Sequence, residues 1–208
     1  MFKATFDIVG ITPISFSKML HEEKRDNETH DKMDQRVWRL KGHYAQGRKP
    51  HDDDELFIPA VMLRKALAST AKYLGIKVPG KGANLYTKHF ERGIVVQNLI
   101  SSEGRPVGIG TTRKEVTEIA LPCNSQGKKG GKGGSTVIRR FPIVHEWSTS
   151  FVVDVIDDVI TEEVFEHVLR RCGMINGLGR WRPQNGGDNG RFTIENLAIE
   201  LPVAVGAK

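Results

Sequence analysis

The stretch GLGRWRPQNGGDNGRF (residues 177–192) lies between two segments whose hydrophobic patterns have different periods. Downstream of it, Phe192 and Ile194 begin an alternating pattern that is typical of a β-strand. Upstream of it, Thr161 is a residue type that caps helices. The apolar residues that follow Thr161 at helical spacing are Val164, Phe165, Val168, Leu169 and Cys172. The stretch therefore connects a helix to a final strand through a glycine-rich, cationic segment.

The N-terminal half contains a unit of the same kind. FKATFDIV (2–9) alternates strictly, which predicts a half-buried strand. FIPAVMLRKALASTAKYLG (57–75) predicts a helix, because Pro59 suits a first helical turn and Gly75 suits a helix end. Residues 94–100 and 147–155 read as two more strands. The expected buried stripe of the helix is Leu63, Ala66, Leu67, Thr70, Ala71 and Leu74.

Two successive strand–helix–strand units predict the α+β class, with a ferredoxin-like (RRM-like) β-α-β-β-α-β core. A change of parity near Asn196 indicates a β-bulge in the last strand. Residues 17–56 form a polar insertion, in which we expect a short helix around 34–40. Residues 101–140 form a turn-rich, flexible middle lobe with a low-complexity tip at 123–136. We expect one domain, 1–208, that carries both insertions.

Composition limits the setting of the protein. The 208 residues include 31 Lys and Arg against 25 Asp and Glu, a net charge of +6 that is compatible with a polyanionic partner. Cys123 and Cys172 form no CxxC pair, which favours a reduced, intracellular setting. No apolar run approaches the ~18 residues of a membrane span, and the N-terminus lacks a signal-peptide pattern. We therefore expect a cytoplasmic protein with no membrane partner.

The connection 177–192 has the chemistry of a phosphate-binding loop. Glycines let backbone N–H groups approach a phosphate, and arginines donate charge-assisted hydrogen bonds to it. Arg180, Arg182 and Arg191 are the candidate phosphate ligands, and Trp181 is a candidate for stacking on a base. The alternative is a flexible surface joint with Trp181 in the core and solvated arginines. A Rossmann fingerprint is excluded, because that motif leads into a helix and this stretch leads into a strand.

Three segments resemble the RAMP superfamily, the ferredoxin-like proteins of CRISPR effector complexes: VGITPISFS (9–17), FIPAVMLRKALAS (57–69) and the glycine-rich stretch itself. The resemblance is strongest to the backbone subunits that coat guide RNA. It implies a protein of antiviral defence that polymerises along single-stranded RNA and contacts further copies of itself, other effector subunits and target nucleic acid. The RNA contacts that it implies are Arg64 and Lys65 in the helix start and Gly177, Gly179, Arg180, Arg182, Gly186, Gly187, Gly190 and Arg191 in the loop.

Further basic residues lie in the middle lobe. Its tip is not a P-loop, because Gly133 follows Lys132 where that motif requires Ser or Thr. An extended cationic segment can still reach a polyanion. The additional candidate RNA contacts are Lys128, Lys129 and Lys132 in the tip and Arg139 and Arg140 where it rejoins the fold.

Catalysis would require a base or a metal near the scissile phosphate. Asp26, Asp31 and Asp34 are the candidates, because some RAMP proteins use an aspartate after the first strand. Acidic residues are routine in so polar a loop, and HDDDE (51–55) matches no closed ligand set. We therefore expect an RNA-binding protein without catalytic activity, metal or cofactor. The alternatives are an endoribonuclease of the same fold and a relative outside CRISPR complexes that binds single-stranded DNA or has a structural role.

Overall fold

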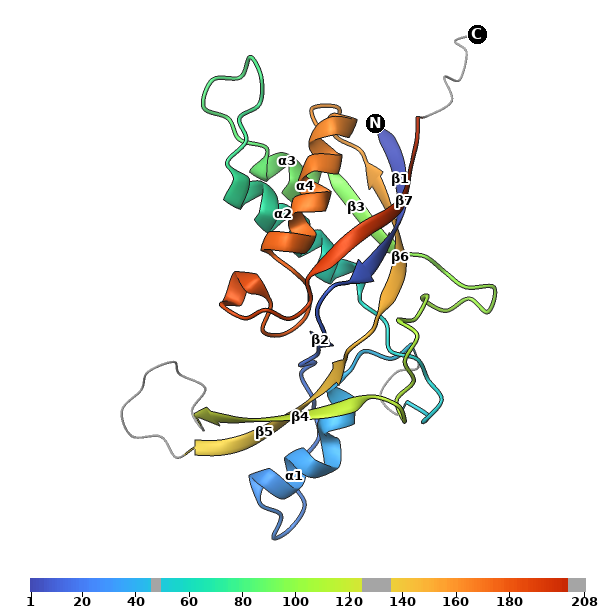
Figure 1. Ribbon diagram of the computed structural model, residues 1–208, viewed down its shortest axis with the longest axis vertical. Helices are drawn as coiled ribbons and strands as arrows, with labels where there is room; N and C mark the ends of the chain where they lie inside the picture. The colour runs from blue at the N-terminus through green and yellow to red at the C-terminus, as the bar shows by residue number, and fades with distance from the viewer. Residues whose placement is uncertain (46–49, 125–135, 202–208) are drawn as a thin grey trace.

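The computed structural model describes residues 1–45, 50–124 and 136–201 (Figure 1). Lys128, Lys129 and Lys132 lie outside the described residues. The elements are, in chain order, β1 (Phe2–Gly10), β2 (Ile14–Ser15), α1 (His30–Val37), η1 (Trp38–Lys41), α2 (Ala60–Leu74), α3 (Thr87–Arg92), β3 (Ile94–Asn98), β4 (Thr117–Asn124), β5 (Thr136–Val144), β6 (Ser148–Val155), α4 (Glu162–Ile175), η2 (Pro183–Asn185) and β7 (Phe192–Glu200).

The larger sheet has the strand order β3-β6-β1-β7, and its neighbouring strands are antiparallel. In the chain, α2 lies between β1 and β3, and α4 lies between β6 and β7. Both helices cover one face of the sheet (Figure 1). The alternation of β1 buries Phe2, Ala4, Phe6 and Ile8, and the Phe2 ring packs edge-on against Phe165 of α4. This topology confirms the α+β, ferredoxin-like core.

Local signals in the sequence explain the ends of these elements. Thr161 caps α4 by accepting a hydrogen bond from the Val164 backbone N–H, and Gly75 ends α2 in the left-handed conformation. Asn196 in β7 has a φ of 49°, and the β1–β7 register shifts between Thr5 and Asp7. The predicted bulge is therefore confirmed at the position where the hydrophobic parity changes.

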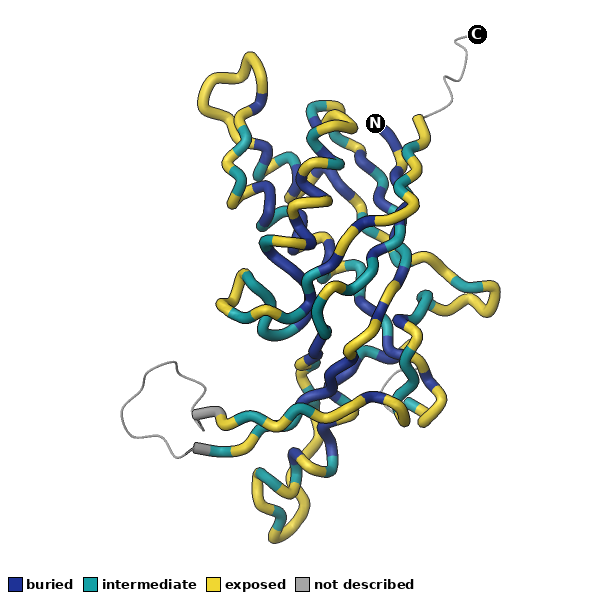
Figure 2. The backbone as a smooth tube through the Cα atoms, viewed as in Figure 1, coloured by how far each residue is buried: buried dark blue, intermediate teal, exposed yellow. Residues whose placement is uncertain are grey.

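The middle lobe differs from the prediction. Segments that we expected to be turns form β4 and β5, which pair along their length and add β2 to make a second, three-stranded sheet. Helix α1 begins earlier than expected, because Thr29 caps it by accepting from the Lys32 backbone N–H. Figure 2 shows that burial is densest between the larger sheet and its helices, whereas β4 is mostly exposed and α1 and β5 are buried only in part.

No helix among the described residues is both long and apolar enough to span a bilayer.

Candidate nucleic-acid interface

The glycine-rich loop is fixed by backbone hydrogen bonds to the segment after β1. The Arg180 N–H donates to the Ser15 carbonyl (2.7 Å), and the Gly190 N–H donates to the Pro13 carbonyl (2.8 Å). Within the loop, the Leu178 N–H donates to the Gly190 carbonyl over 2.9 Å. The loop therefore has a defined backbone conformation that is tied at both ends to the segment after β1.

Most of the loop glycines are required by this packing. Gly179 has a φ of 77°, and a Cβ at this position would lie 2.5 Å from the Ser15 carbonyl oxygen. Gly177 and Gly190 are also left-handed and pack against loop backbone, and a Cβ on Gly187 would collide with the Trp181 carbonyl. Gly186 differs, because its left-handed backbone (φ 79°) borders open space. Gly186 is thus the loop glycine with the most open surroundings, and its N–H donates to the Pro183 carbonyl over 2.9 Å.

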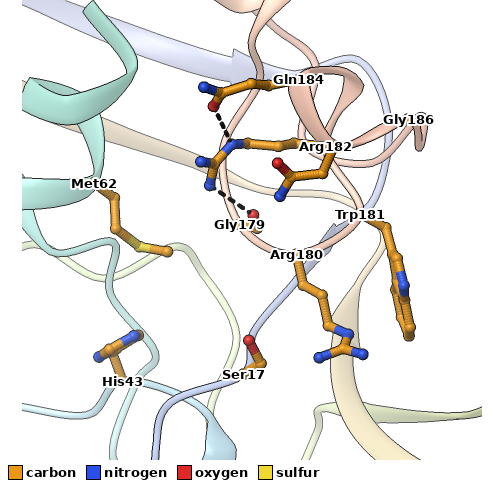
Figure 3. Close-up of a pocket in the computed structure, with 10 residues that line it drawn as sticks. Ser17, His43, Met62, Gly179, Arg180, Trp181, Arg182, Gln184 and Gly186 are labelled. Atoms are coloured by element: carbon orange, nitrogen blue, oxygen red, sulfur yellow. Dashed lines mark hydrogen bonds between the residues drawn. The ribbon is translucent and has the colours of Figure 1, made fainter. Parts of the chain in front are cut away.

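A groove of about 880 Å³ opens between this loop and the start of α2 (Figure 3). Arg180, Trp181 and Arg182 lie on the loop side of the groove. Met62 from the first turn of α2 lies on the opposite side, with His43 from the polar insertion. The remaining lining residues are Ser17, Gly179, Gln184, Asn185 and Gly186.

Arg180 and Trp181 pack together on Phe141 of β5. The Arg180 guanidinium carbon lies 3.7 Å from the centroid of the Phe141 ring and 4.4 Å from that of the Trp181 ring. The two aromatic rings meet edge-on, with centroids 5.3 Å apart. The Trp181 side chain is half-buried on Phe141 and also lines the groove, so stacking on a base stays a prediction.

The other loop arginines are oriented by hydrogen bonds. Arg182 donates from Nε to Gln184 Oε1 (2.9 Å) and from Nη1 to the Gly179 carbonyl (3.2 Å). Gln184 donates in turn to Ser69 Oγ of α2 over 2.6 Å. Arg191 pairs with Asp188 (3.1 Å) and donates to the carbonyl of Met174 at the end of α4, away from the groove lining.

The two basic residues predicted on α2 lie on different sides of the helix. Lys65 is exposed and shares a helical face with Met62 and Ser69, because these residues are three and four positions from it. That face borders the loop through the bond from Gln184 to Ser69. Arg64 instead donates to the Glu91 carbonyl of α3 over 3.0 Å. The structure thus brings Lys65, and not Arg64, to the groove side of α2.

Arg139 and Arg140 take part in an ion-pair network with the insertion. Arg140 pairs with Asp31 (2.6 Å) and Glu118 (2.9 Å), and its backbone N–H donates to Asp34. Asp34 is 3% exposed, pairs with Lys41 (2.9 Å) and lies 3.4 Å from an Nη of Arg139. These contacts anchor α1 to β5, so they compete with phosphate for both arginines.

The candidate aspartates therefore differ in their surroundings. Hydrogen bonds from the Arg140 N–H and Lys41 outweigh the cost of burial and lower the pKa of Asp34. Asp26 is exposed in a turn. In the acidic run, Asp52 pairs with Arg113 and Asp53 with Lys114. Within the described ranges, no group of three or more His, Cys, Asp or Glu side chains is placed to hold a metal ion.

Sequence reasoning missed Ser17, His43 and Met62 as groove residues and Phe141 as the support of Arg180. Burial lowers the pKa of His43 to about 4, with a smaller contribution from Lys18. These residues come from separate parts of the chain, so no local spacing connects them. The available signal was that Ser17 and Met62 lie within two of the segments, 9–17 and 57–69, on which the family resemblance rests.

Three solved structures to which the chain is similar are those of CRISPR proteins or complexes. One is a chain in the Type III-B Cmr-beta bound to cognate target RNA, with 12% identity over 95% of this chain and 61% of that chain and a TM-score of 0.46. Another is a CRISPR protein from Archaeoglobus fulgidus, with 12% identity over 96% and 64% and a TM-score of 0.35. A third is a chain of a CRISPR RNA-guided surveillance complex, with 10% identity over 96% and 72% and a TM-score of 0.35.

This chain spans slightly more than three fifths of the length of the first two of these structures, 61% and 64%. No family model matches the chain. The search of curated proteins likewise gives no match.

Proposed function

We propose that this chain is a single-stranded-RNA-binding subunit of a CRISPR-type ribonucleoprotein, in the role of a backbone subunit that coats guide RNA. The observation that carries the proposal is the groove between the glycine-rich loop and α2, which Arg180 and Arg182 line from an ordered loop. Preorganised cations of this kind neutralise phosphates without reading the sequence of bases. The three RAMP-like segments of the sequence support the CRISPR assignment.

The outward face of the larger sheet favours the groove over the sheet as the RNA-binding surface. Opposite the helices, this face carries Asp7, Asp154 and Glu195. Asp7 accepts hydrogen bonds from Ser150 and Asn196, so its carboxylate is part of the surface of the sheet. Carboxylates repel phosphates, and stacking on a sheet in the manner of an RRM requires exposed aromatic rings.

Binding of an unstructured RNA of about 20 nucleotides, measured by fluorescence anisotropy from low to high salt, tests the proposal. We expect affinity to fall steeply with salt, because bound phosphates release counterions. Arg182→Ala should weaken binding by about 1–3 kcal/mol, by a similar amount for unrelated sequences. Arg170→Ala is the matched control, since Arg170 pairs with Glu166 on the exposed side of α4. Salt-independent binding, or equal effects of the two substitutions, would refute the proposal.

Polymerisation along the RNA is part of the same proposal. A backbone subunit binds in multiple copies, so sedimentation of the complex should give more protein per strand as the RNA is lengthened. Comparison with single-stranded DNA of the same sequence distinguishes the proposal from the alternative of a DNA-binding relative. Equal affinity for both strands, with a constant ratio of one protein per strand, would favour that alternative.

A further inference from the structure

At one end the groove is lined by two side chains that carry no charge at physiological pH, and we propose that these, His43 and Met62, form a subsite there for an unstacked nucleobase of the bound strand. This inference rests on the proposed function and adds to it a contact to the base. Figure 3 shows the two side chains together on one side of the groove, across Ser17 from Arg180. A strand whose phosphate contacts the arginines can therefore turn one base toward His43 and Met62.

The ring of His43 is held in a defined position by its neighbours. Phe16 meets it edge-on with ring centroids 6.0 Å apart, and Phe57 meets it edge-on at 6.3 Å. The half-buried ring thus has support on its core side while it lines the groove. A flat ring fixed in this way is a stacking surface, and histidine is among the side chains on which unpaired bases stack in RNA-binding proteins.

The two side chains that line this end of the groove fit a base better than a phosphate. Burial and the nearby Lys18 lower the pKa of His43 to about 4, so the imidazole is neutral at physiological pH. Met62 presents a flexible, polarisable thioether that packs well against aromatic rings. A phosphate would gain no ion pair from either side chain, whereas a base would bury its face against both.

The arrangement of α2 places this subsite next to the cationic rim. Met62 lies in the first turn of the helix, and Ser69, two turns further along, accepts the hydrogen bond from Gln184 of the loop. One wall of the groove is thus a regular helix and the other is the ordered loop. The position of the base subsite relative to Arg182 is therefore fixed by two rigid elements.

An abasic RNA strand separates base contacts from phosphate contacts. The measured quantity is the ratio of the dissociation constant of an abasic strand to that of oligouridine of the same length and end groups. We expect the folded protein to prefer oligouridine. Met62→Ala and His43→Asn should each lower this ratio about fivefold or more, the scale of one lost stacking contact. Arg182→Ala should weaken both strands and leave the ratio unchanged.

Two further variants serve as controls. His43→Phe keeps a flat ring and should retain the preference, and His167→Asn changes an exposed histidine of α4 and should leave it at the wild-type value. Thermal unfolding checks that each variant is folded, and if His43→Asn unfolds, Met62→Ala decides alone. An unchanged ratio in Met62→Ala, while Arg182→Ala weakens both strands, overturns the subsite and leaves the proposed function standing. Failure of the wild-type protein to bind either strand overturns both.

Discussion

Replacement of Phe141 by leucine should remove the support on which Arg180 and Trp181 rest. The ring is 6% exposed and contacts the Arg180 guanidinium at 3.7 Å and the Trp181 ring at 5.3 Å. Loss of an edge-to-face pair costs about 0.5–1.5 kcal/mol, and loss of a partly desolvated cation–π contact costs about 1–2 kcal/mol. We therefore expect Phe141→Leu to lower the free energy of unfolding by about 1.5–3.5 kcal/mol.

A double-mutant cycle isolates the cation–π contribution. Arg180→Met keeps the aliphatic length of the side chain and removes its charge. The two substitutions should couple by about 0.5–2 kcal/mol in urea denaturation, because each removes the same contact. RNA affinity measured on the same proteins should fall in Phe141→Leu, and the double mutant should bind about as weakly as Arg180→Met alone, since Phe141 does not line the groove and acts by positioning Arg180.

This reasoning would be refuted if the effect of the double mutant equalled the sum of the two single effects within about 0.5 kcal/mol, because substitutions at independent sites add in that way. Phe141→Tyr is the control, since it keeps the aromatic ring and should keep most of the coupling. The structure also changes an expectation from the sequence. Replacement of a solvated loop arginine would change the free energy of unfolding by less than about 0.5 kcal/mol. The packing of Arg180 instead predicts that its replacement lowers the free energy of unfolding measurably.

The remaining predictions concern three other positions. The folded chain disfavours protonation of His43, so the free energy of unfolding should fall by up to about 3 kcal/mol as pH drops from 6.5 to 4. Urea denaturation across that pH range measures the loss, and His43→Phe should remove it. Asp34→Asn should cost about 3–5 kcal/mol of unfolding free energy, because it leaves Lys41 buried without its carboxylate; a cost below 1 kcal/mol would show that the pair is dispensable. Gly187→Val should lower both the melting temperature and RNA affinity, since its Cβ would collide with the Trp181 carbonyl; loss of affinity at an unchanged melting temperature would instead indicate direct contact with the ligand.

The parts of the fold that sequence predicted well are those specified by neighbouring residues. The stripe of α2, the Thr161 cap and the bulge at Asn196 each depend on a few consecutive positions. The second sheet was missed, because β4 contains Pro122 and β5 contains Pro142, and both flank a glycine-rich segment that reads as turns. Their pairing with each other and with β2 is a long-range property that no local pattern contains.

The candidate site was predicted in the same uneven way. The loop was found because glycine and arginine occur together in one stretch, yet the reason for most of its glycines is internal packing and not access to phosphate. The opposite wall depends on His43 and Met62, which approach the loop only after the chain has folded. Burial also decides which ionisable groups are available, as the separate surroundings of Asp34 and Asp26 illustrate.

This difference in surroundings bears on the endoribonuclease alternative. A carboxylate that acts as a general base needs an oxygen within reach of the attacking hydroxyl. The oxygens of Asp34 accept from Lys41 and from the backbone of Arg140, and Asp31 pairs with the Arg140 side chain. To serve as a base, either aspartate would have to give up contacts that anchor α1 to β5. Among the three candidates, the alternative therefore depends on Asp26, which lies exposed in the turn before α1.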